Sequence, residues 1–223
     1  YIITSDEGVI MKKKKLLVTA STFPRWEGDT EPRFVLDLSK QLKKYFDVTV
    51  LAPAAPGARE KEILEGVKVL RYHYFPVHKW ETLCYPGAIV PRIKEKKIRV
   101  LLVPFLFAGL FFKLLRIKSH FDCVHAHWII PQGIVQSFVG MPYIVTGHGG
   151  DVTSLNKGII KKLKLRCLMK ADKITVVSNA LKKEVEALCH RNDVKIISMG
   201  CDTTRFDKKY RVENYFHQGE KPV

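Results

Sequence analysis

The stretch DCVHAHWIIPQGIVQSFVGMPYIVTGHGGD, residues 122–151, sets the pattern of the whole chain. It predicts an apolar strand over 122–128, a short helix over 131–140 and a second strand over 142–149. Both strands are apolar on both faces, which is typical of strands buried between two layers of helices. We therefore expect a parallel pair of strands joined by a helix, the repeating unit of α/β folds.

The same alternation of apolar strands and amphipathic segments extends to both sides of this stretch. Further strands are predicted at KLLVTAS (15–21), DVTVLAP (47–53), VKVLRYHYF (67–75), DKITVVS (172–178) and VKIISMG (194–200). Helices are predicted at PRFVLDLSKQLKKY (32–45), in an apolar segment near 99–116, at KGIIKKLKLRCLMKA (157–171) and at ALKKEVEALC (180–189). Together they predict a doubly wound α/β domain with a mainly parallel sheet of about seven strands.

The two ends of the chain fall outside this pattern. Met11 is followed by four lysines and resembles an initiation site, so we assign residues 1–10 to leader or added sequence and 11–206 to the domain. Residues 207–223 are polar and lack periodicity, which indicates a linker toward a further domain.

Composition favours a soluble globular protein with anionic partners. The 223 residues include 38 Lys and Arg against 22 Asp and Glu, a formal net charge of +16. This excess attracts phosphorylated ligands and acidic lipid headgroups. Nucleic acid is not expected as a partner, because the zinc-finger, aromatic RNA-binding and basic-zipper signatures are all missing from the sequence. Five scattered cysteines without a C-x-x-C pair favour a reducing cytoplasm.

The loop after the first strand excludes the common cofactor-binding classes. It holds a single glycine, Gly28, so it is not the G-x-G-x-x-G turn of nicotinamide and flavin enzymes. The chain also lacks the phosphate-binding loop of P-loop nucleoside triphosphatases and the nucleophile elbow of α/β-hydrolases. We expect no cofactor.

Polar, aromatic and glycine residues gather where the predicted strands end. Ligands of open parallel sheets bind beyond the carboxyl ends of the strands, so these residues are candidates for a site. They are Arg25, Trp26, Gly28, Asp29, His125, His127, Trp128, His148, Asp151, Ser178, Asn179, Gly200 and Asp202.

Several of these residues also have a purely structural interpretation. His148 can be a loop histidine bonded to its neighbours, Asp151 can cap the next segment, and Ser178 or Asn179 can cap a helix. His125 and His127 alternate on a strand and face the same side, where one or both can be core histidines. Tryptophan is buried by default.

Five of the strand-end motifs resemble, in order and spacing, those of the family 4 retaining glycosyltransferases. They are TFPRWEGDTEPRFVLDLSKQL, VHAHW, PYIVTGHGGDV, ADKITVVSNALKKEV and ISMGCDTTRF, and the resemblance covers roughly residues 16–206. The resemblance implies a Rossmann-like domain that forms one half of a GT-B fold. It also implies a C-terminal donor-binding domain as partner, a nucleotide-sugar as substrate and a glycan or lipid-linked acceptor. Sugar transfer would retain the anomeric configuration and require no metal.

The resemblance also distributes roles over the candidate residues. It implies that His148 is the catalytic-site histidine near the transferred sugar and that Gly28 and Asp29 face the donor. It places Arg25, Trp26, His127, Trp128, Asp151 and Asn179 on the acceptor side. Because the family's carboxylate motif for the donor lies in the C-terminal domain, we expect this half alone to be inactive.

Two other functional classes remain open from the sequence. His125, His127, His148 and Asp151 include an H-x-H pair on a strand, which can ligate zinc or iron in a metal-dependent hydrolase. The second alternative is a non-catalytic acceptor-binding subunit of a split transferase.

One apolar stretch raises the question of a membrane. Val100 to Phe112 contains thirteen uncharged residues, fewer than the roughly 20 that span a bilayer. We expect a helix buried in the domain. The flanking lysines and arginines also permit a helix that docks on an anionic membrane, at the inner leaflet of the cell membrane.

Overall fold

The computed structural model describes residues 13–200 and residue 209. The predicted leader (1–10), the last motif beyond Gly200 and, apart from residue 209, the predicted linker (207–223) lie outside the described residues.

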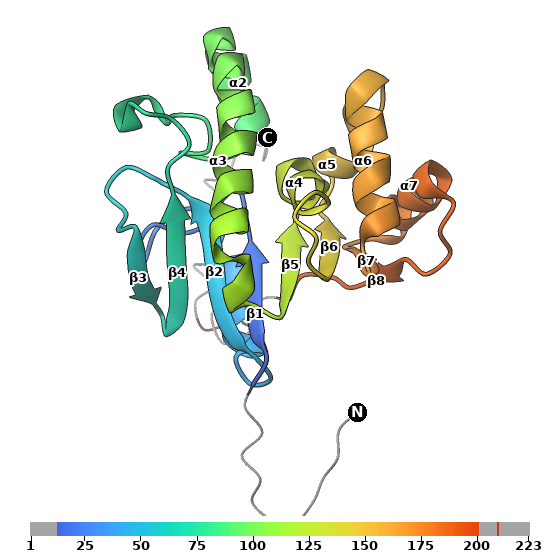
Figure 1. Ribbon diagram of the computed structural model, residues 1–223, viewed down its shortest axis with the longest axis horizontal. Coiled ribbons are helices and arrows are strands. Elements are labelled where there is room, and N and C mark those ends of the chain that lie inside the picture. The colour runs from blue at the N-terminus through green and yellow to red at the C-terminus, as the bar shows by residue number, and fades with distance from the viewer. Residues whose placement is uncertain (1–12, 201–208, 210–223) are drawn as a thin grey trace, which may run out of the picture.

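One eight-stranded sheet forms the centre of the domain, in the order β3-β4-β2-β1-β5-β6-β7-β8 (Figure 1). Every neighbouring pair is parallel except β3 and β4. The strands are β1 (Lys15–Thr19), β2 (Asp47–Pro53), β3 (Lys61–Leu64), β4 (Val67–Tyr72), β5 (Cys123–His127), β6 (Tyr143–Gly147), β7 (Lys173–Val176) and β8 (Lys195–Ile196). The predicted mainly parallel α/β fold is confirmed.

The strand that the sequence pattern did not reveal is β3. It lies at the edge of the sheet and pairs with β4 through a two-residue turn, Glu65 and Gly66, both with positive φ. Such turns match the twist of antiparallel strands. Only Leu64 is fully buried in β3, so its burial pattern lacks the continuous apolar run of the central strands.

Helices follow most strands and account for the rest of the fold. They are α1 (Phe34–Leu42), α2 (Ile89–Glu95), α3 (Val103–Ile117), α4 (Ile134–Gln136), α5 (Gly150–Thr153), α6 (Gly158–Lys170) and α7 (Asn179–Cys189). Short 3-10 turns occupy His78–Trp80 (η1), Lys97–Leu102 (η2) and Lys118–His120 (η3), and a π-type turn, η4 (Ile129–Gly133), precedes α4.

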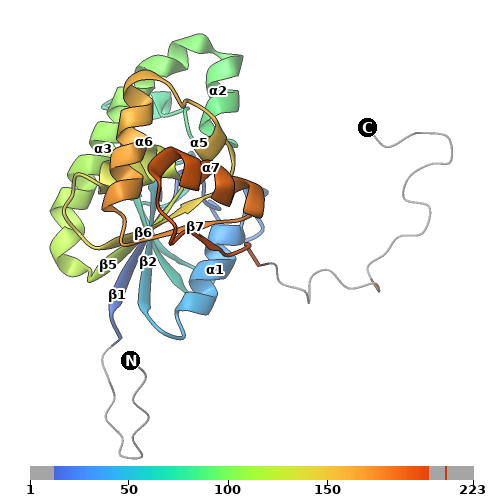
Figure 2. The same cartoon turned by 90° about the vertical axis from the view of Figure 1, so that its right-hand side faces the viewer.

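The sheet is covered on both faces. Val35 and Leu36 of α1 pack with Leu16, Val18 and the same-facing residues of β2 and β4. The opposite face carries α3, and Figure 2 shows α1 and α3 on opposite sides of the strands. β1 is almost completely buried along its length, as expected for a central strand between two helical layers.

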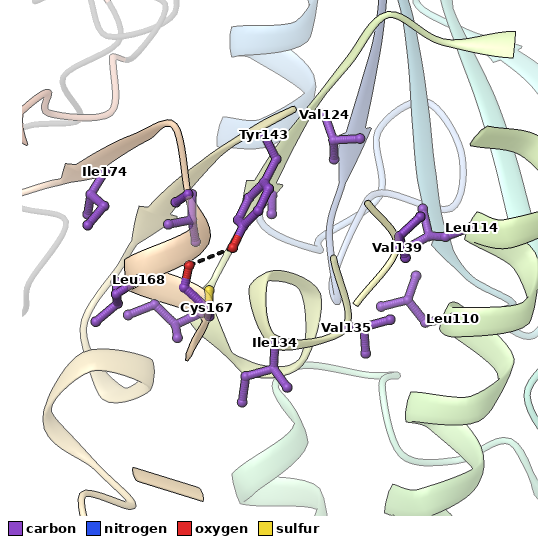
Figure 3. Close-up of a cluster of buried hydrophobic side chains, with 14 of the residues drawn as sticks. Leu110, Leu114, Val124, Ile134, Val135, Val139, Tyr143, Cys167, Leu168 and Ile174 are labelled. Carbon is purple, nitrogen blue, oxygen red and sulfur yellow. Dashed lines mark hydrogen bonds between the residues drawn. The ribbon is translucent and has the colours of Figure 1, made fainter. Parts of the chain in front are cut away.

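The second core cluster joins α3, α4 and α6 to strands β5 and β6. Figure 3 shows Leu110 and Leu114 of α3 facing Val135 and Val139. The Tyr143 side chain points toward Cys167. The Tyr143 hydroxyl donates a hydrogen bond of 2.5 Å to the carbonyl oxygen of Cys167 in α6. Burial among these groups raises the pKa of the Tyr143 phenol. This cluster fixes the strands whose ends carry the candidate histidines.

Helix α2 was not among the predicted helices. The segment CYPGAIVPRIKEKK (84–97), which holds α2, contains Pro91. Pro91 is the third residue of α2, within the first turn, where the missing N–H removes no intrahelical hydrogen bond.

Candidate active site

The strand order reverses at the centre of the sheet, between β1 and β5, and open α/β sheets bind ligands at such a point. β1 pairs with β2 on one side and with β5 on the other, so consecutive connections leave in opposite directions. Loops at the carboxyl ends of two such strands diverge and leave a crevice between them. Trp128 directly follows β5, and the loop after neighbouring β6 begins at His148.

The loop after β6 is held by one carboxylate. Asp151 Oδ1 accepts hydrogen bonds from the backbone N–H groups of His148 (3.0 Å) and Gly149 (2.9 Å), and its Oδ2 accepts one from Ile129 (2.8 Å). Three backbone donors that would otherwise lack intrahelical partners are satisfied in this way. Asp151 thus joins the loops after β5 and β6, and its carboxylate positions His148.

The His148 ring is bonded to the ring of His127. His127 Nδ1 lies 3.0 Å from His148 Nε2, whereas His127 Nε2 is buried without a hydrogen-bond partner among the described residues. A buried N–H without an acceptor is rarer and costlier than an unpaired acceptor nitrogen. We therefore assign the proton of His127 to Nδ1, as donor to His148. This tautomer leaves the Nδ1–H of His148 free to donate to a ligand.

Burial keeps the three histidines neutral. It lowers the pKa of His148, although the nearby Asp151 charge opposes the shift, and it lowers the pKa of His127 well below its usual value. It also lowers the pKa of His125 to about 4. A neutral imidazole at His148 can donate or accept a hydrogen bond near neutral pH without adding a charge.

His125 and His127 face the same side of β5, as the strand period predicts. Their ring centroids lie 4.3 Å apart. His125 Nε2 is bonded to Thr146 Oγ1 at 2.7 Å, and Thr146 Oγ1 is bonded to Thr175 Oγ1 at 2.6 Å. His125 is therefore a satisfied histidine of the interior, one layer behind the His127–His148 pair.

Two aromatic residues surround His148. The Trp128 and Phe34 rings lie 4.9 Å and 5.2 Å from the His148 ring, centroid to centroid, and 5.7 Å from each other. Trp128 has a positive φ of 71°, an uncommon conformation that turns the chain sharply at the end of β5. Phe34 begins α1 and was not among the candidate site residues.

A cavity of about 380 Å³ lies in front of these groups. Trp128, His148 and Asp151 line it together with Ser21 and Thr22 from the loop after β1. Its remaining wall is mostly apolar and comes from Ile89 and Ile93 of α2, Phe107 of α3, Ile130 and Leu155. The sequence did not identify this wall, because no helix was predicted at α2 and α3 was expected to be buried in the domain.

The loop after β1 has a different arrangement. Asp29 accepts hydrogen bonds from the Arg25 guanidinium (2.8 Å and 2.9 Å) and from two backbone N–H groups, those of Arg25 and Thr30. The Arg25 bonds lower the pKa of Asp29 to about 2. Trp26 is 43% exposed, and the Arg25 guanidinium lies 4.2 Å from its ring centroid. Gly28, with φ of +79°, is exposed.

The structure therefore brings only part of the predicted site together. Trp128, His148 and Asp151 line the cavity and His127 supports His148, whereas Arg25, Trp26, Gly28 and Asp29 form a separate surface loop. Asn179 is exposed at the start of α7, outside the cavity lining, and the adjacent Ser178 caps that helix by accepting from the Leu181 N–H at 3.3 Å.

The four residues considered for a metal-dependent hydrolase do not converge on one point. His127 and His148 are bonded to each other, His125 is bonded to Thr146, and both Asp151 oxygens accept from backbone. Within residues 13–200 and 209, no group of three His, Cys, Asp or Glu side chains is arranged to hold a metal ion. The geometry thus gives this alternative no support.

Comparison with known proteins identifies a related family. The family model described as Glycosyltransferase Family 4 matches residues 32–205. Among curated proteins, no significant match is found.

Solved structures of low sequence identity share the fold. The catalytic domain of Arabidopsis thaliana starch synthase IV, bound to ADP and acarbose, matches 88% of the chain with a TM-score of 0.57 at 11% identity. Anabaena HepE in complex with UDP and glucose matches 86% with a TM-score of 0.55 at 14% identity. Sucrose-phosphate synthase from Thermosynechococcus elongatus matches 85% with a TM-score of 0.52 at 14% identity, over 90% of that chain. The chain spans 53% of the starch synthase structure and 46% of HepE.

Proposed function

The chain belongs to glycosyltransferase family 4, and we propose that it forms the acceptor-side half of a retaining, GT-B enzyme. In this proposal the enzyme transfers a hexose from a nucleotide-sugar to a glycan or lipid-linked acceptor of the cell envelope, with no metal or cofactor. A C-terminal donor-binding domain completes the cleft.

The observation that carries the proposal is the state of His148. Asp151 fixes its backbone, His127 fixes its ring, its Nδ1–H has no hydrogen-bond partner among the described residues, and His148 lines the cavity. Transfer of a glycosyl group develops positive charge on the sugar ring and negative charge on the departing diphosphate. A neutral, oriented donor holds a sugar hydroxyl in place without repelling the cationic ring, and this is the role that we propose for His148.

The cavity supports an acceptor with an apolar part. Its wall from α2 and α3 is dominated by aliphatic and aromatic side chains, while its polar side chains come from other segments: Ser21, Thr22, His148, Asp151 and Ser154. Cavities of this kind bind the apolar portion of a ligand and orient its polar end by a few hydrogen bonds. We therefore favour an amphiphilic, lipid-linked acceptor over a purely polar glycan, with Trp128 available to stack on its sugar.

The donor assignment rests on the relatives. HepE was solved with UDP and glucose, and starch synthase IV with ADP and acarbose, so nucleotide and sugar ligands occur in this fold. In the proposal Gly28 and Asp29 face the donor, and Arg25, Trp26 and Asn179 contact the outer part of the acceptor. Because the Asp29 carboxylate is bonded to Arg25 and to two backbone N–H groups, the donor contact would come from the backbone around Gly28.

The first experiment is a binding titration on this chain. We expect calorimetry to detect a short-chain lipid-linked acceptor and to detect UDP-glucose and ADP-glucose weakly or not at all. Tight binding of a nucleotide-sugar by this chain alone would reverse the assignment of its side of the cleft.

The second experiment tests catalysis in an enzyme that joins this chain to its donor-binding domain. His148→Ala is expected to lower turnover by about 100-fold or more, the usual effect of losing one oriented donor, while the thermal unfolding midpoint is kept. His120→Ala, at an exposed histidine outside the cavity lining, is the matched control. Turnover within a few-fold of the parent would remove His148 from the catalytic role. An acceptor-binding chain that stays inactive with every donor-binding domain would instead indicate a non-catalytic subunit.

A further inference from the structure

The outer face of the α3 segment is apolar and uncovered. Leu101 is 64%, Phe105 44%, Phe112 64% and Leu115 37% exposed. Phe105, Phe112 and Leu115 are seven and three residues apart, which places them on one side of α3, and Leu101 precedes them in η2. We call these four residues the outer stripe. Figures 1 and 2 show α3 at the periphery of the domain, and no described element lies over its outer side.

The inner face of the same helix is anchored in the core. Leu106, Leu110 and Leu114 are at most 1% exposed. At Gly109 a Cβ atom would lie 2.9 Å from Tyr74 Cα, so the helix approaches the end of β4 closely enough to exclude a side chain. The expectation that α3 is a buried helix therefore holds for one face only. A surface helix that is apolar on both faces is unlike the amphipathic helices of soluble domains.

The packing of the inner face of α3 favours a helix that lies on a membrane over one that crosses it. Lys97–His120 is long and apolar enough for a span by length and composition, with a mean hydropathy of 2.1 and 17% of the window buried. A span would remove the inner leucines from the domain core and expose the strands beneath them. The packed helix can instead place the outer stripe in the interfacial region of a bilayer.

The charges around the outer stripe are basic except for Glu95, which is paired with Arg92 and Arg99. Residues 97–120 contain no Asp or Glu. Lys94 and Lys97 precede the stripe, Lys113 and Arg116 lie toward its end, and none of the four forms an ion pair with another described residue. Cations near an apolar surface favour anionic headgroups by about 1 kcal/mol each. Two copies of this surface, in contrast, would bring like charges together.

An aromatic side chain extends the outer stripe at its edge. Trp80 is 55% exposed and lies 5.8 Å from Phe75, which in turn lies 4.8 Å from Phe105, between ring centroids. Tryptophan prefers the level of the headgroups, where its apolar ring and its N–H are both accommodated.

We propose that the outer stripe and Trp80 insert into the interface of an anionic lipid leaflet, with Lys94, Lys97, Lys113 and Arg116 at the headgroups. This docking does not depend on sugar transfer. It also has a geometric consequence, because Val90 of α2 is 55% exposed and lines the cavity beside His148. Docking through α3 would hold the apolar wall of the cavity next to the lipid from which an amphiphilic acceptor comes.

The test is co-sedimentation of the chain with vesicles at low and moderate salt. We expect binding to equal parts phosphatidylcholine and phosphatidylglycerol, at least tenfold weaker binding to phosphatidylcholine alone, and weaker binding as salt rises. A blue shift of tryptophan emission should accompany binding. The shift should be lost in Trp80→Phe and kept in Trp26→Phe.

Matched variants distinguish binding through the outer stripe from non-specific adsorption to vesicles. Leu101→Gln with Phe112→Gln is expected to weaken vesicle binding at least tenfold. Ile63→Gln with Ile159→Gln, at equally exposed apolar positions elsewhere, should leave it unchanged. Lys94→Gln, Lys97→Gln and Arg116→Gln together should abolish the preference for anionic vesicles. Replacement of Lys161, Lys162 and Lys170 of α6 with glutamine should leave the preference for anionic vesicles unchanged.

Four outcomes would overturn the proposal. The first is no binding to either vesicle by a folded chain, and the second is equal loss in both pairs of variants. The third is resistance of the bound chain to alkaline carbonate, which would indicate a spanning segment. The fourth is a dimer in the absence of lipid that dissociates in Leu101→Gln with Phe112→Gln, which would assign the stripe to a second copy.

Discussion

The loops after β1 and β6 contain similar residues and use them differently. Each carries an aspartate, at least one glycine, a basic or imidazole side chain and a neighbouring aromatic ring. In the loop after β6, Asp151 binds three backbone N–H groups and leaves the His148 side chain facing the cavity. In the loop after β1, Asp29 binds the side chain of Arg25, so the two charges satisfy each other. What an aspartate does for a neighbouring group depends on which donors the fold brings to it.

The largest effect is expected at Asp151. Asp151→Ala leaves the N–H groups of Ile129, His148 and Gly149 without their acceptor and should lower the free energy of unfolding by about 3 kcal/mol. Chemical denaturation of the chain measures the change. Asp151→Asn should cost less, because its amide oxygen can still accept two of the three bonds. A loss below about 1 kcal/mol for the alanine variant would mean that water replaces the carboxylate.

The next largest effect is a dependence of stability on pH, which follows from the protonation of the buried histidines. The pKa of His125 falls from 6.5 to about 4 on folding, and burial also lowers the pKa values of His127 and His148. The unfolded chain therefore binds more protons between about pH 6.5 and pH 4. The contribution of these histidines to the free energy of unfolding should be complete above this window. For His125 it should fall by about 3 kcal/mol as pH drops through the window. Denaturation midpoints across this range, with His125→Gln as the flatter reference, test the sign.

A smaller effect is expected for the other aspartate. Asp29→Ala removes bonds to Arg25 and to the backbone N–H groups of Arg25 and Thr30, but the Arg25 side chain and the loop can be solvated. We expect a loss of about 1–2 kcal/mol in the free energy of unfolding. A double-mutant cycle with Arg25→Met isolates the contribution of the charged pair. A coupling near zero would show that the backbone bonds account for the whole effect.

The smallest effect is expected at Gly28. Its φ is +79° and a Cβ atom there would meet nothing within 4 Å, so only backbone strain opposes a side chain. Gly28→Ala should cost about 1 kcal/mol in unfolding free energy. Gly150→Ala, in α5 with ordinary φ and an open Cβ direction, is the control that should cost nothing or stabilise slightly. In the completed enzyme, a selective rise in the donor KM for Gly28→Ala would support its proposed place beside the donor.

Much of the fold could be predicted because its strongest signals are local. The central strands are continuous apolar runs, and the amphipathic periods of α1 and α7 were recognisable as helices. The misses have specific causes. β3 has a weak apolar pattern, and α2 carries a proline in the one turn where a helix accepts it. The two faces of α3 could not be distinguished from a sequence that is apolar all round.

The candidate site was predicted less completely than the fold. His127, Trp128, His148 and Asp151 were found because residues at adjacent strand ends must be neighbours in a parallel sheet. Phe34 was missed because its contact with His148 joins α1 to the loop after β6, far away in sequence. The pairing of Arg25 with Asp29 was missed although only four residues separate them, because the loop conformation that joins them has no periodic signature.

The sequence by itself determined the strands, the order of the motifs and the edge of the sheet where polar groups gather, since these follow from local apolar patterns and chain connectivity. Only the tertiary structure decided that Asp151 positions His148, that His127 orients its ring and that α3 leaves an apolar face uncovered. Those properties depend on which groups from distant segments reach hydrogen-bond or packing distance, and that is fixed only when the layers have assembled.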